Sequence, residues 1–198
     1  MKTFAALFRA LDETTATTAR LAALESYFRS APDADRVWTV ALLSGRRPRR
    51  AATTTELRQW AAEAAGVPDW LFGESYALAG DLAETIALIL PPGQPSATST
   101  GLADTLAALS RLAGQPTEAR RAFVEAAWAS LAPDARFLFT KLLTGGFRMG
   151  VSRGLTTRAL ARATGQDEAQ LAHRLMGDWD PAATGFADLV AGRGHQGQ

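Results

Sequence analysis

The chain has 198 residues, enough for one domain or for two small lobes that share a core. It has no cysteine, which excludes disulfides, thiolate metal sites and a cysteine nucleophile, and its two histidines disfavour a histidine-based metal site or triad. The net charge is only +1, but 19 of the 21 basic residues are arginine, whose planar fork suits phosphate. No signal peptide or membrane-spanning stretch is visible, so we expect a cytoplasmic protein without a membrane partner.

The first part of the chain predicts a series of helices, because apolar residues recur at helical spacing and β-branched runs are scarce. Thr53 and Glu56 have the spacing of a capping box, and glycine ends several of the apolar stretches. In chain order, the expected helices are residues 4–11, a helix capped by a threonine among 14–18 and ending near 29, a helix capped by Asp33 or Asp35 and stopped by Gly45, a helix from Thr53 to Gly66, a short helix around 70–76, and a helix that runs to Leu90 with Asp81 as its N-cap.

The second part repeats this order after residues 91–100, which are rich in Pro, Gly, Ser and Thr and are predicted to form a linker. The expected helices are 117–131, a helix capped by Asp134 and ending at Thr144, a helix from about 155 to 164, and a last segment with Leu171 and Leu175. Residues 191–198 are expected to form a disordered tail or the start of a linker. No alternating strand pattern occurs, so the predicted fold class is all-α. The tryptophans at apolar helical positions are expected in the core, namely Trp38, Trp60, Trp70 and Trp128.

The chain also repeats itself about a hundred residues apart. LLSGRRPRR (residues 42–50) is answered by LLTGGFRMG (142–150), and SAPDADR (30–36) by LAPDAR (131–136). Phe28 falls on Trp128, the helix end at Gly66 on Gly165, and Gly80-Asp81 on Gly177-Asp178. Such self-similarity predicts a pseudo-twofold duplicated helical domain with halves 1–90 and 101–190. Chance similarity in an alanine-rich chain is the alternative, but the matches include Pro, Gly, Asp and aromatic positions.

The repeated breaks are the candidate site. Each copy ends an apolar helix at Ser-Gly or Thr-Gly and continues into a loop with arginine. The first loop is a candidate phosphate-contact cluster that would give salt-dependent affinity, consisting of Ser44, Gly45, Arg46, Arg47, Arg49 and Arg50. The second offers uncovered backbone N–H groups, an arginine for the minor groove and a capped helix start, in Thr144, Gly145, Gly146, Arg148, Gly150 and Ser152. Gly80 has no side chain and could allow the backbone to approach DNA closely. A solvated loop and a plain helix–helix turn are the alternatives.

Catalysis has little support in the sequence. There is no Gly-x-x-x-x-Gly-Lys loop, no HExxH and no GxSxG pattern, and the carboxylates are scattered. Asp178 and Asp180 flank Trp179 and could bind a metal, but they more simply mark a turn.

Several of these segments resemble one family. LLTGGFRMGVS (142–152) resembles the signature of the N-terminal DNA-binding domain of ATP-dependent DNA ligases, and GDLAET (80–85) is similar to a second motif of that domain. Residues 4–24 and LLSGRRPRR resemble the opening of the bacterial branch. The resemblance covers residues 1–190. It implies an all-helical, pseudo-twofold DNA-binding domain that binds the minor groove on both sides of a nick, with contacts at Gly145, Gly146, Arg148, Gly150 and residues 44–47.

The family's Lys-x-Asp-Gly nucleophile motif is absent, since neither Lys2 nor Lys141 fits it. We therefore expect no catalysis and no cofactor in this chain; ATP and Mg²⁺ would serve the full-length ligase. The implied partners are nicked double-stranded DNA, the ligase's catalytic core, and a helicase and nuclease, in repair, recombination or replication. The chain is either a ligase fragment or a stand-alone relative. The alternatives are a helical-repeat protein-interaction scaffold without DNA binding, and an enzyme with an unrecognised site.

Overall fold

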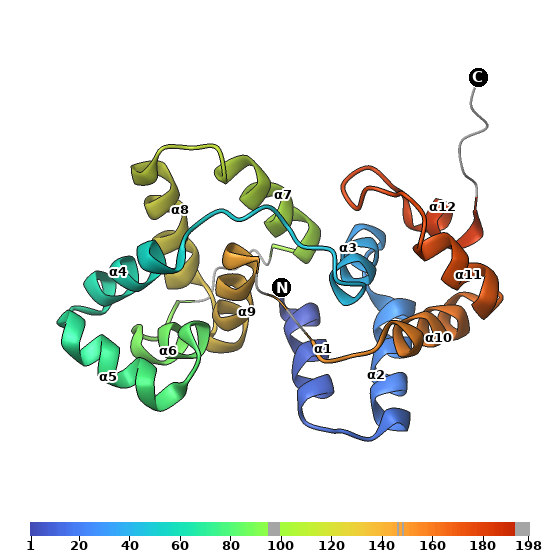
Figure 1. The fold of residues 1–198 in the computed structure, drawn as a ribbon, viewed down its shortest axis with the longest axis horizontal. Coiled ribbons are helices and arrows are strands. Elements are labelled where there is room, and N and C mark those ends of the chain that lie inside the picture. The colour runs from blue at the N-terminus through green and yellow to red at the C-terminus, as the bar shows by residue number, and fades with distance from the viewer. Residues whose placement is uncertain (95–99, 146, 148, 193–198) are drawn as a thin grey trace. The chain divides into compact units, whose positions relative to one another are not determined.

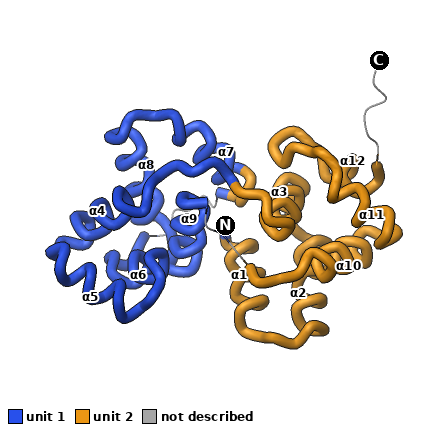
Figure 2. Tube along the Cα trace, viewed as in Figure 1, with its two compact units in different colours: residues 1, 48–100, 104–147 blue, residues 2–47, 101–103, 148–198 orange. Residues whose placement is uncertain are grey.

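The computed structural model describes residues 1–94, 100–145, 147 and 149–192. Within these residues the chain forms twelve α-helices and no strand (Figure 1), which confirms the all-α prediction. The helices divide into two compact units (Figure 2). Unit 1 comprises residues 1, 48–100 and 104–147, and unit 2 comprises residues 2–47, 101–103 and 148–198. The predicted tail beyond residue 192 and part of the predicted linker, 95–99, lie outside the described residues.

Unit 2 is built around the pairing of α2 with α10. Its helices are α1 (Lys2–Asp12), α2 (Thr17–Ser30), α3 (Asp33–Leu43), α10 (Arg153–Thr164), α11 (Glu168–Leu175) and α12 (Phe186–Ala191). α1 packs on α2, α3 on α12 and α10, and α11 on both α10 and α12. Apolar side chains of the paired helices, such as Leu24, Phe28 and Leu160, are fully buried and form the core of the unit.

Unit 1 shows the corresponding helix pairs, α4 with α8 and α6 with α9. Its helices are α4 (Thr54–Ala65), α5 (Asp69–Ala79), α6 (Leu82–Ile89), α7 (Leu102–Leu112), α8 (Thr117–Ser130) and α9 (Pro133–Thr144). α4 packs on α8, α6 on α9, and α4, α5 and α6 pack on one another. Leu57, Ile86, Val124 and Leu142 are fully buried among them.

The two units exchange helices between the sequence repeats. In the repeat, α2 corresponds to α8, α3 to α9, α4 to α10 and α6 to α12. Unit 2 pairs α2 with α10 and α3 with α12, and unit 1 pairs α8 with α4 and α9 with α6. The same pairings therefore recur, but each unit takes three helices from each half of the chain. This recurrence supports the duplication, whereas the compact units do not coincide with the predicted halves; the boundaries of those halves stay a prediction.

The repeat is also visible in hydrogen bonds to buried backbone. Arg36 Nη1 donates to the carbonyl of Phe28 at 2.8 Å, and Arg136 Nε donates to the carbonyl of Trp128 at 3.0 Å. Both arginines follow by eight residues the carbonyl they bind, and both join the end of one helix to the next. A chance match of sequence letters would not reproduce this contact in two separate units.

Three predicted helix caps are wrong. α3 begins after Pro32 without a side-chain cap, and Asp35 instead accepts a hydrogen bond from the N–H of Ala103 at 2.9 Å. α9 begins with Pro133 at its first position, so Asp134 lies inside the first turn. Proline's fixed φ suits the first turn of a helix, and an aspartate there interacts favourably with the helix dipole without capping it. The threonine cap of α2 is also wrong, because its N-cap is Ala16.

The second half differs from the predicted repeat in two further places. α7 and α12 were not predicted. Gly80-Asp81 starts α6 with Asp81 as the N-cap, but Gly177-Asp178 lies in the turn after α11, and α12 begins only at Phe186. The correspondence of these two dipeptides is therefore wrong.

The tryptophans are only partly in the core. Trp60 and Trp128 are buried and Trp38 is half-buried, whereas Trp70 is 68% exposed. Phe72 is the residue of α5 that enters the core, and two residues correspond to about 200° of helix rotation, which turns Trp70 to the opposite side. The core prediction for Trp70 is wrong.

Candidate nucleic-acid interface

The two predicted breaks have the same backbone geometry. Gly45 has φ +87° and its N–H donates to the carbonyl of Leu42 at 3.1 Å; Gly145 has φ +67° and its N–H donates to the carbonyl of Leu142 at 3.2 Å. The left-handed conformation favours glycine at both positions, as the sequence predicts. Ser44 is the C-cap of α3.

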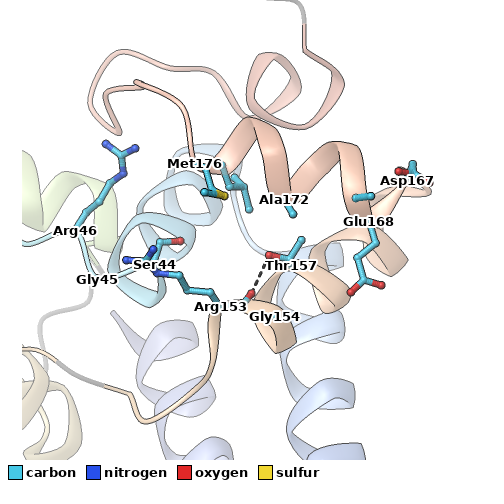
Figure 3. A pocket seen from close by; sticks show the side chains of 12 residues that line it. Ser44, Gly45, Arg46, Arg153, Gly154, Thr157, Asp167, Glu168, Ala172 and Met176 are labelled. Atoms are coloured by element: carbon cyan, nitrogen blue, oxygen red, sulfur yellow. Dashed lines mark hydrogen bonds between the residues drawn. The ribbon is translucent and has the colours of Figure 1, made fainter.

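In unit 2, the first break lies beside the start of α10. A Cβ placed on Gly45 would be 3.7 Å from Nη2 of Arg153. This region forms one side of an open hollow of about 860 Å³. Figure 3 shows its lining side chains, with those of α11 on the opposite side. The polar side is lined by Ser44, Gly45, Arg46, Arg153 and Gly154, and α11 contributes Asp167, Glu168 and several apolar residues.

Arg46 makes several contacts within unit 2. Its Nη1 donates to the carbonyl of Trp179 at 2.7 Å, its Nη2 donates to the carbonyl of Gly177 at 3.0 Å, and the guanidinium lies 4.2 Å from the centroid of the Trp179 ring. Arg46 therefore attaches residues 177–179 to the end of α3. Its role as a phosphate contact stays a prediction.

Arg153 is exposed at the first position of α10, and the sequence analysis missed it. Ser152 caps this helix by accepting a hydrogen bond from the N–H of Leu155 at 3.1 Å, as predicted. No acidic residue lies in the first turn, and Gly154 leaves the backbone uncovered, so this helix start favours an anion. An arginine directly after a predicted Ser cap is the signal that could have identified it.

In unit 1, the second break lies beside the segment before α4. A Cβ on Gly145 would be 3.4 Å from the carbonyl oxygen of Pro48, and the N–H of Ala51 donates to the carbonyl of Leu143 at 3.0 Å. Arg49 and Arg50, between these contacts, are exposed and make no hydrogen bond or ion pair with the described residues. The backbone segment that carries these two exposed arginines is thus held against the end of α9.

The start of α4 differs chemically from that of α10. Thr53 and Glu56 form the predicted capping box, with 3.1 Å between each side chain and the other residue's N–H. Arg120 of α8 binds both carboxylate oxygens of Glu56, at 2.9 and 2.8 Å. The Arg120 hydrogen bonds lower the pKa of Glu56 to about 2. A carboxylate of this chain therefore already occupies the anion position at this helix start.

The remaining predicted residues lie in varied places. Gly80 ends α5 with φ +74° and is exposed, and next to it Asp81 accepts from the N–H of Glu84 at 2.9 Å and pairs with Lys141. Thr144 is the last residue of α9. Gly150 is exposed with φ +64°. Gly146 and Arg148 lie outside the described residues.

The arrangement combines both repeats in each unit. The break of the first repeat lies beside the start of α10 in unit 2, and the break of the second lies beside residues 48–51 in unit 1. The four arginines of the first loop do not share a unit: Arg46 and Arg47 belong to unit 2, and Arg49 and Arg50 to unit 1. Arg47 is exposed.

The described residues form neither a membrane-spanning helix nor a metal-binding cluster. None of their helices is long and apolar enough to cross a membrane. Nor do three or more of their His, Asp or Glu side chains gather in a way that could hold a metal ion.

The family described as DNA ligase N terminus matches residues 1–161, and the chain belongs to this family. DNA ligase B of Mycobacterium tuberculosis (strain CDC 1551 / Oshkosh) is 35% identical over 100 residues, which are 50% of this chain and 20% of the relative. A probable DNA ligase of Mycobacterium bovis (strain ATCC BAA-935 / AF2122/97) matches with the same identity and coverage. The matched stretch thus spans 20% of the length of these relatives. Together these matches support the interpretation of the chain as the DNA-binding module of a ligase.

Proposed function

We propose that the chain binds nicked double-stranded DNA without sequence preference, through phosphate and minor-groove contacts, as the DNA-binding module of an ATP-dependent DNA ligase. One observation carries the proposal: in each unit a glycine-ended helix lies beside a segment with exposed arginine. Gly45 lies beside Arg153 in unit 2, and Gly145 lies beside the segment of Arg49 and Arg50 in unit 1. Because the chain belongs to the DNA ligase family, DNA is the ligand that we propose for this pattern.

The chemistry of these segments suits the DNA backbone. The exposed arginines would bind phosphates and release counterions, which gives affinity that falls with salt and does not depend on sequence. Gly80 and Gly150 are exposed and carry no side chain, so their backbone could approach the floor of a minor groove closely, whereas Gly145 is buried against the segment before α4. The N-terminus of α10 would add a partial positive charge on the side of unit 2.

The joining chemistry would belong to a catalytic core. The sequence lacks the Lys-x-Asp-Gly motif, so ATP and Mg²⁺ would serve that core and not these helices. The module's task would be to hold the nicked ends for the core during DNA repair, replication or recombination in the cytoplasm. A helicase and a nuclease are the further partners we propose.

Fluorescence anisotropy with a labelled nicked duplex tests the DNA-binding role. The affinity should fall steeply between about 50 and 200 mM salt, and each lost phosphate contact should reduce the log–log slope by about 0.9. Arg49→Ala should weaken binding to unrelated sequences equally. Arg111→Ala is the matched control, because Arg111 is also exposed in unit 1 but lies on α7 and belongs to neither break. Salt-independent binding, or equal effects of the two variants, would refute these contacts.

A protein-interaction scaffold is the second candidate, and α5 is the observation that favours it. Trp70, Leu71 and Leu78 of this helix are exposed, with Leu78 at 90%. Exposed tryptophan is a common anchor of protein interfaces. A chain that does not bind nicked duplex even at about 50 mM salt would favour this candidate over the DNA-binding role.

A further inference from the structure

Arg120 is an arginine whose hydrogen-bonding capacity is fully used inside unit 1. A guanidinium has five N–H donors. Its Nε donates to the carbonyl of Gln115 at 3.2 Å. Nη1 donates to the carbonyl of Ala51 at 3.2 Å and to Glu56 at 2.9 Å, and Nη2 donates to Glu56 at 2.8 Å and to the hydroxyl of Thr117 at 3.2 Å. No donor is left for a DNA phosphate.

These bonds fix the residue that follows the exposed arginines. Ala51 is 3% exposed, and both of its backbone polar groups are bound: the N–H to the carbonyl of Leu143, at 3.0 Å, and the carbonyl to Arg120. Arg49 and Arg50 directly precede this anchored residue. Their backbone is therefore fixed by α8 and by the end of α9, although their side chains remain exposed.

The same contact occurs in unit 2 with the repeats exchanged. Arg20, 100 residues before Arg120, lies on α2, the counterpart of α8. Its Nη1 donates to the carbonyl of Gly150 at 3.2 Å, and its Nε to the carbonyl of Thr14 at 2.7 Å. Gly150 stands two residues before the N-cap of α10, as Ala51 stands two residues before the N-cap of α4.

The two contacts differ in one respect. Leu155 occupies the third position of α10, where α4 has Glu56. Arg20 therefore binds the carbonyl before its helix without the carboxylate that accompanies Arg120. The element common to both units is an arginine that bridges two segments: it binds a carbonyl just before its own helix and the carbonyl two residues before the N-cap of the helix paired with it. This is a geometric role and not a general charge effect.

We propose that Arg20 and Arg120 are a duplicated pair of positioning residues, which hold the DNA-contacting segments before α10 and α4 in place without touching DNA. This inference rests on the proposed DNA-binding function. Arg20 and Arg120 are half-buried, and their proposed role differs from that of the exposed arginines. The exposed arginines would contact phosphate, and these two would determine where the contacting segments lie.

The test uses lysine, which keeps the positive charge but cannot reproduce the planar fork. Arg120→Lys and Arg20→Lys should each weaken binding of a labelled nicked duplex about tenfold and lower the salt slope by about one, because a phosphate contact is displaced. The control Arg111→Lys should bind as the unmodified chain does. Full affinity of both lysine variants would overturn the inference, since charge alone would then suffice.

A double-mutant cycle separates positioning from direct contact. If Arg120 acts through the segment before α4, Arg120→Lys should weaken binding by less than about twofold once Arg49→Ala and Arg50→Ala are already present. A full, additive effect in that background would mean that Arg120 contacts DNA itself and would overturn its positioning role. Arg20→Lys is tested in the same way in an Arg153→Ala background.

Urea unfolding of each variant shows whether it is folded. Arg20 makes only two of these bonds, so its variant decides the question if Arg120→Lys fails to fold. The failure of the inference is distinct from the failure of the proposed function. If the unmodified chain does not bind nicked duplex, the function itself fails; if it binds with a normal salt slope and the lysine variants bind equally well, only the positioning role fails.

Discussion

Replacing Gly145 by alanine tests whether the end of α9 controls the arginine segment of unit 1. Gly145 has φ +67°, and a methyl group there would lie 3.4 Å from the carbonyl oxygen of Pro48. Gly66 is a matched control: it ends α4 in the same unit with φ +69°, and a methyl group there would meet nothing within 4 Å. Both substitutions place alanine in the left-handed region, but only Gly145→Ala adds a methyl group in contact with the backbone before Arg49, so only there would a shift that relieves the left-handed strain reach the arginine segment.

The expected magnitudes follow from this difference. The left-handed conformation costs alanine about 1 kcal/mol relative to glycine, so both variants should lower the free energy of unfolding by about that amount. For a protein of this size, about 1 kcal/mol corresponds to a decrease in Tm of roughly 2–4 °C. The affinity for nicked duplex should fall only for Gly145→Ala, and a displaced contact of about 1 kcal/mol would weaken binding about fivefold.

Two measurements check the reasoning. Thermal unfolding reports the strain, and anisotropy with a nicked duplex reports the displacement of the segment. Equal DNA affinity of the two variants would show that the end of α9 does not position Arg49 and Arg50. A Gly66→Ala variant as stable as the unmodified chain would show that the left-handed strain is not the cause of the stability loss.

Three further outcomes are expected. The ion pair with Arg120 depresses the pKa of Glu56 to about 2. The pair should therefore add about 1–2 kcal/mol to the free energy of unfolding at this partly exposed site above about pH 4.3, and this stability should be lost as the pH falls towards 2. Urea unfolding should show that the free energy of unfolding of Glu56→Gln falls less over that pH range than that of the unmodified chain. Arg136 is 1% exposed and donates to four carbonyls at the ends of α6 and α8 and just beyond. Arg136→Met should cost about 3 kcal/mol in urea unfolding, and a loss below about 1 would contradict the burial argument. Trp60→Ala should cost about 3–5 kcal/mol because Trp60 is 3% exposed, whereas Trp70→Ala should change stability by less than about 0.5 kcal/mol; equal losses would place Trp70 in the core after all.

The features that the sequence predicts correctly are local. The capping box of Thr53 and Glu56, the Asp81 cap of α6 and the left-handed glycines at 45 and 145 each depend on residues within about four positions of one another. When a side chain and a backbone N–H are only a few residues apart, they meet however the helix is packed. Such signals therefore survive whatever the tertiary arrangement is.

The sequence does not reveal which helices pack on one another or which distant residues come into contact. A duplicated chain offers α4 two equivalent surfaces, α2 of its own repeat and α8 of the other, and the apolar pattern fits either one. The structure pairs α4 with α8. For the same reason the sequence could not show that Arg46 would bind carbonyls at 177 and 179, more than a hundred residues away, or that Arg153 would lie beside Gly45.

The exchange of helices suggests how one repeated sequence could give the two different DNA contacts that we propose. In unit 1 the carboxylate of Glu56 already occupies the start of α4, so in the proposed complex a phosphate would be bound by the exposed side chains of Arg49 and Arg50. In unit 2 the equivalent residue is Leu155, which has no carboxylate, so in the proposed complex backbone N–H groups beside Arg153 could bind a phosphate. Both helix starts are nevertheless held by an equivalent arginine of the other repeat. The shared geometry is therefore set by the duplication, and the chemistry of each contact by one residue in the first turn of the helix.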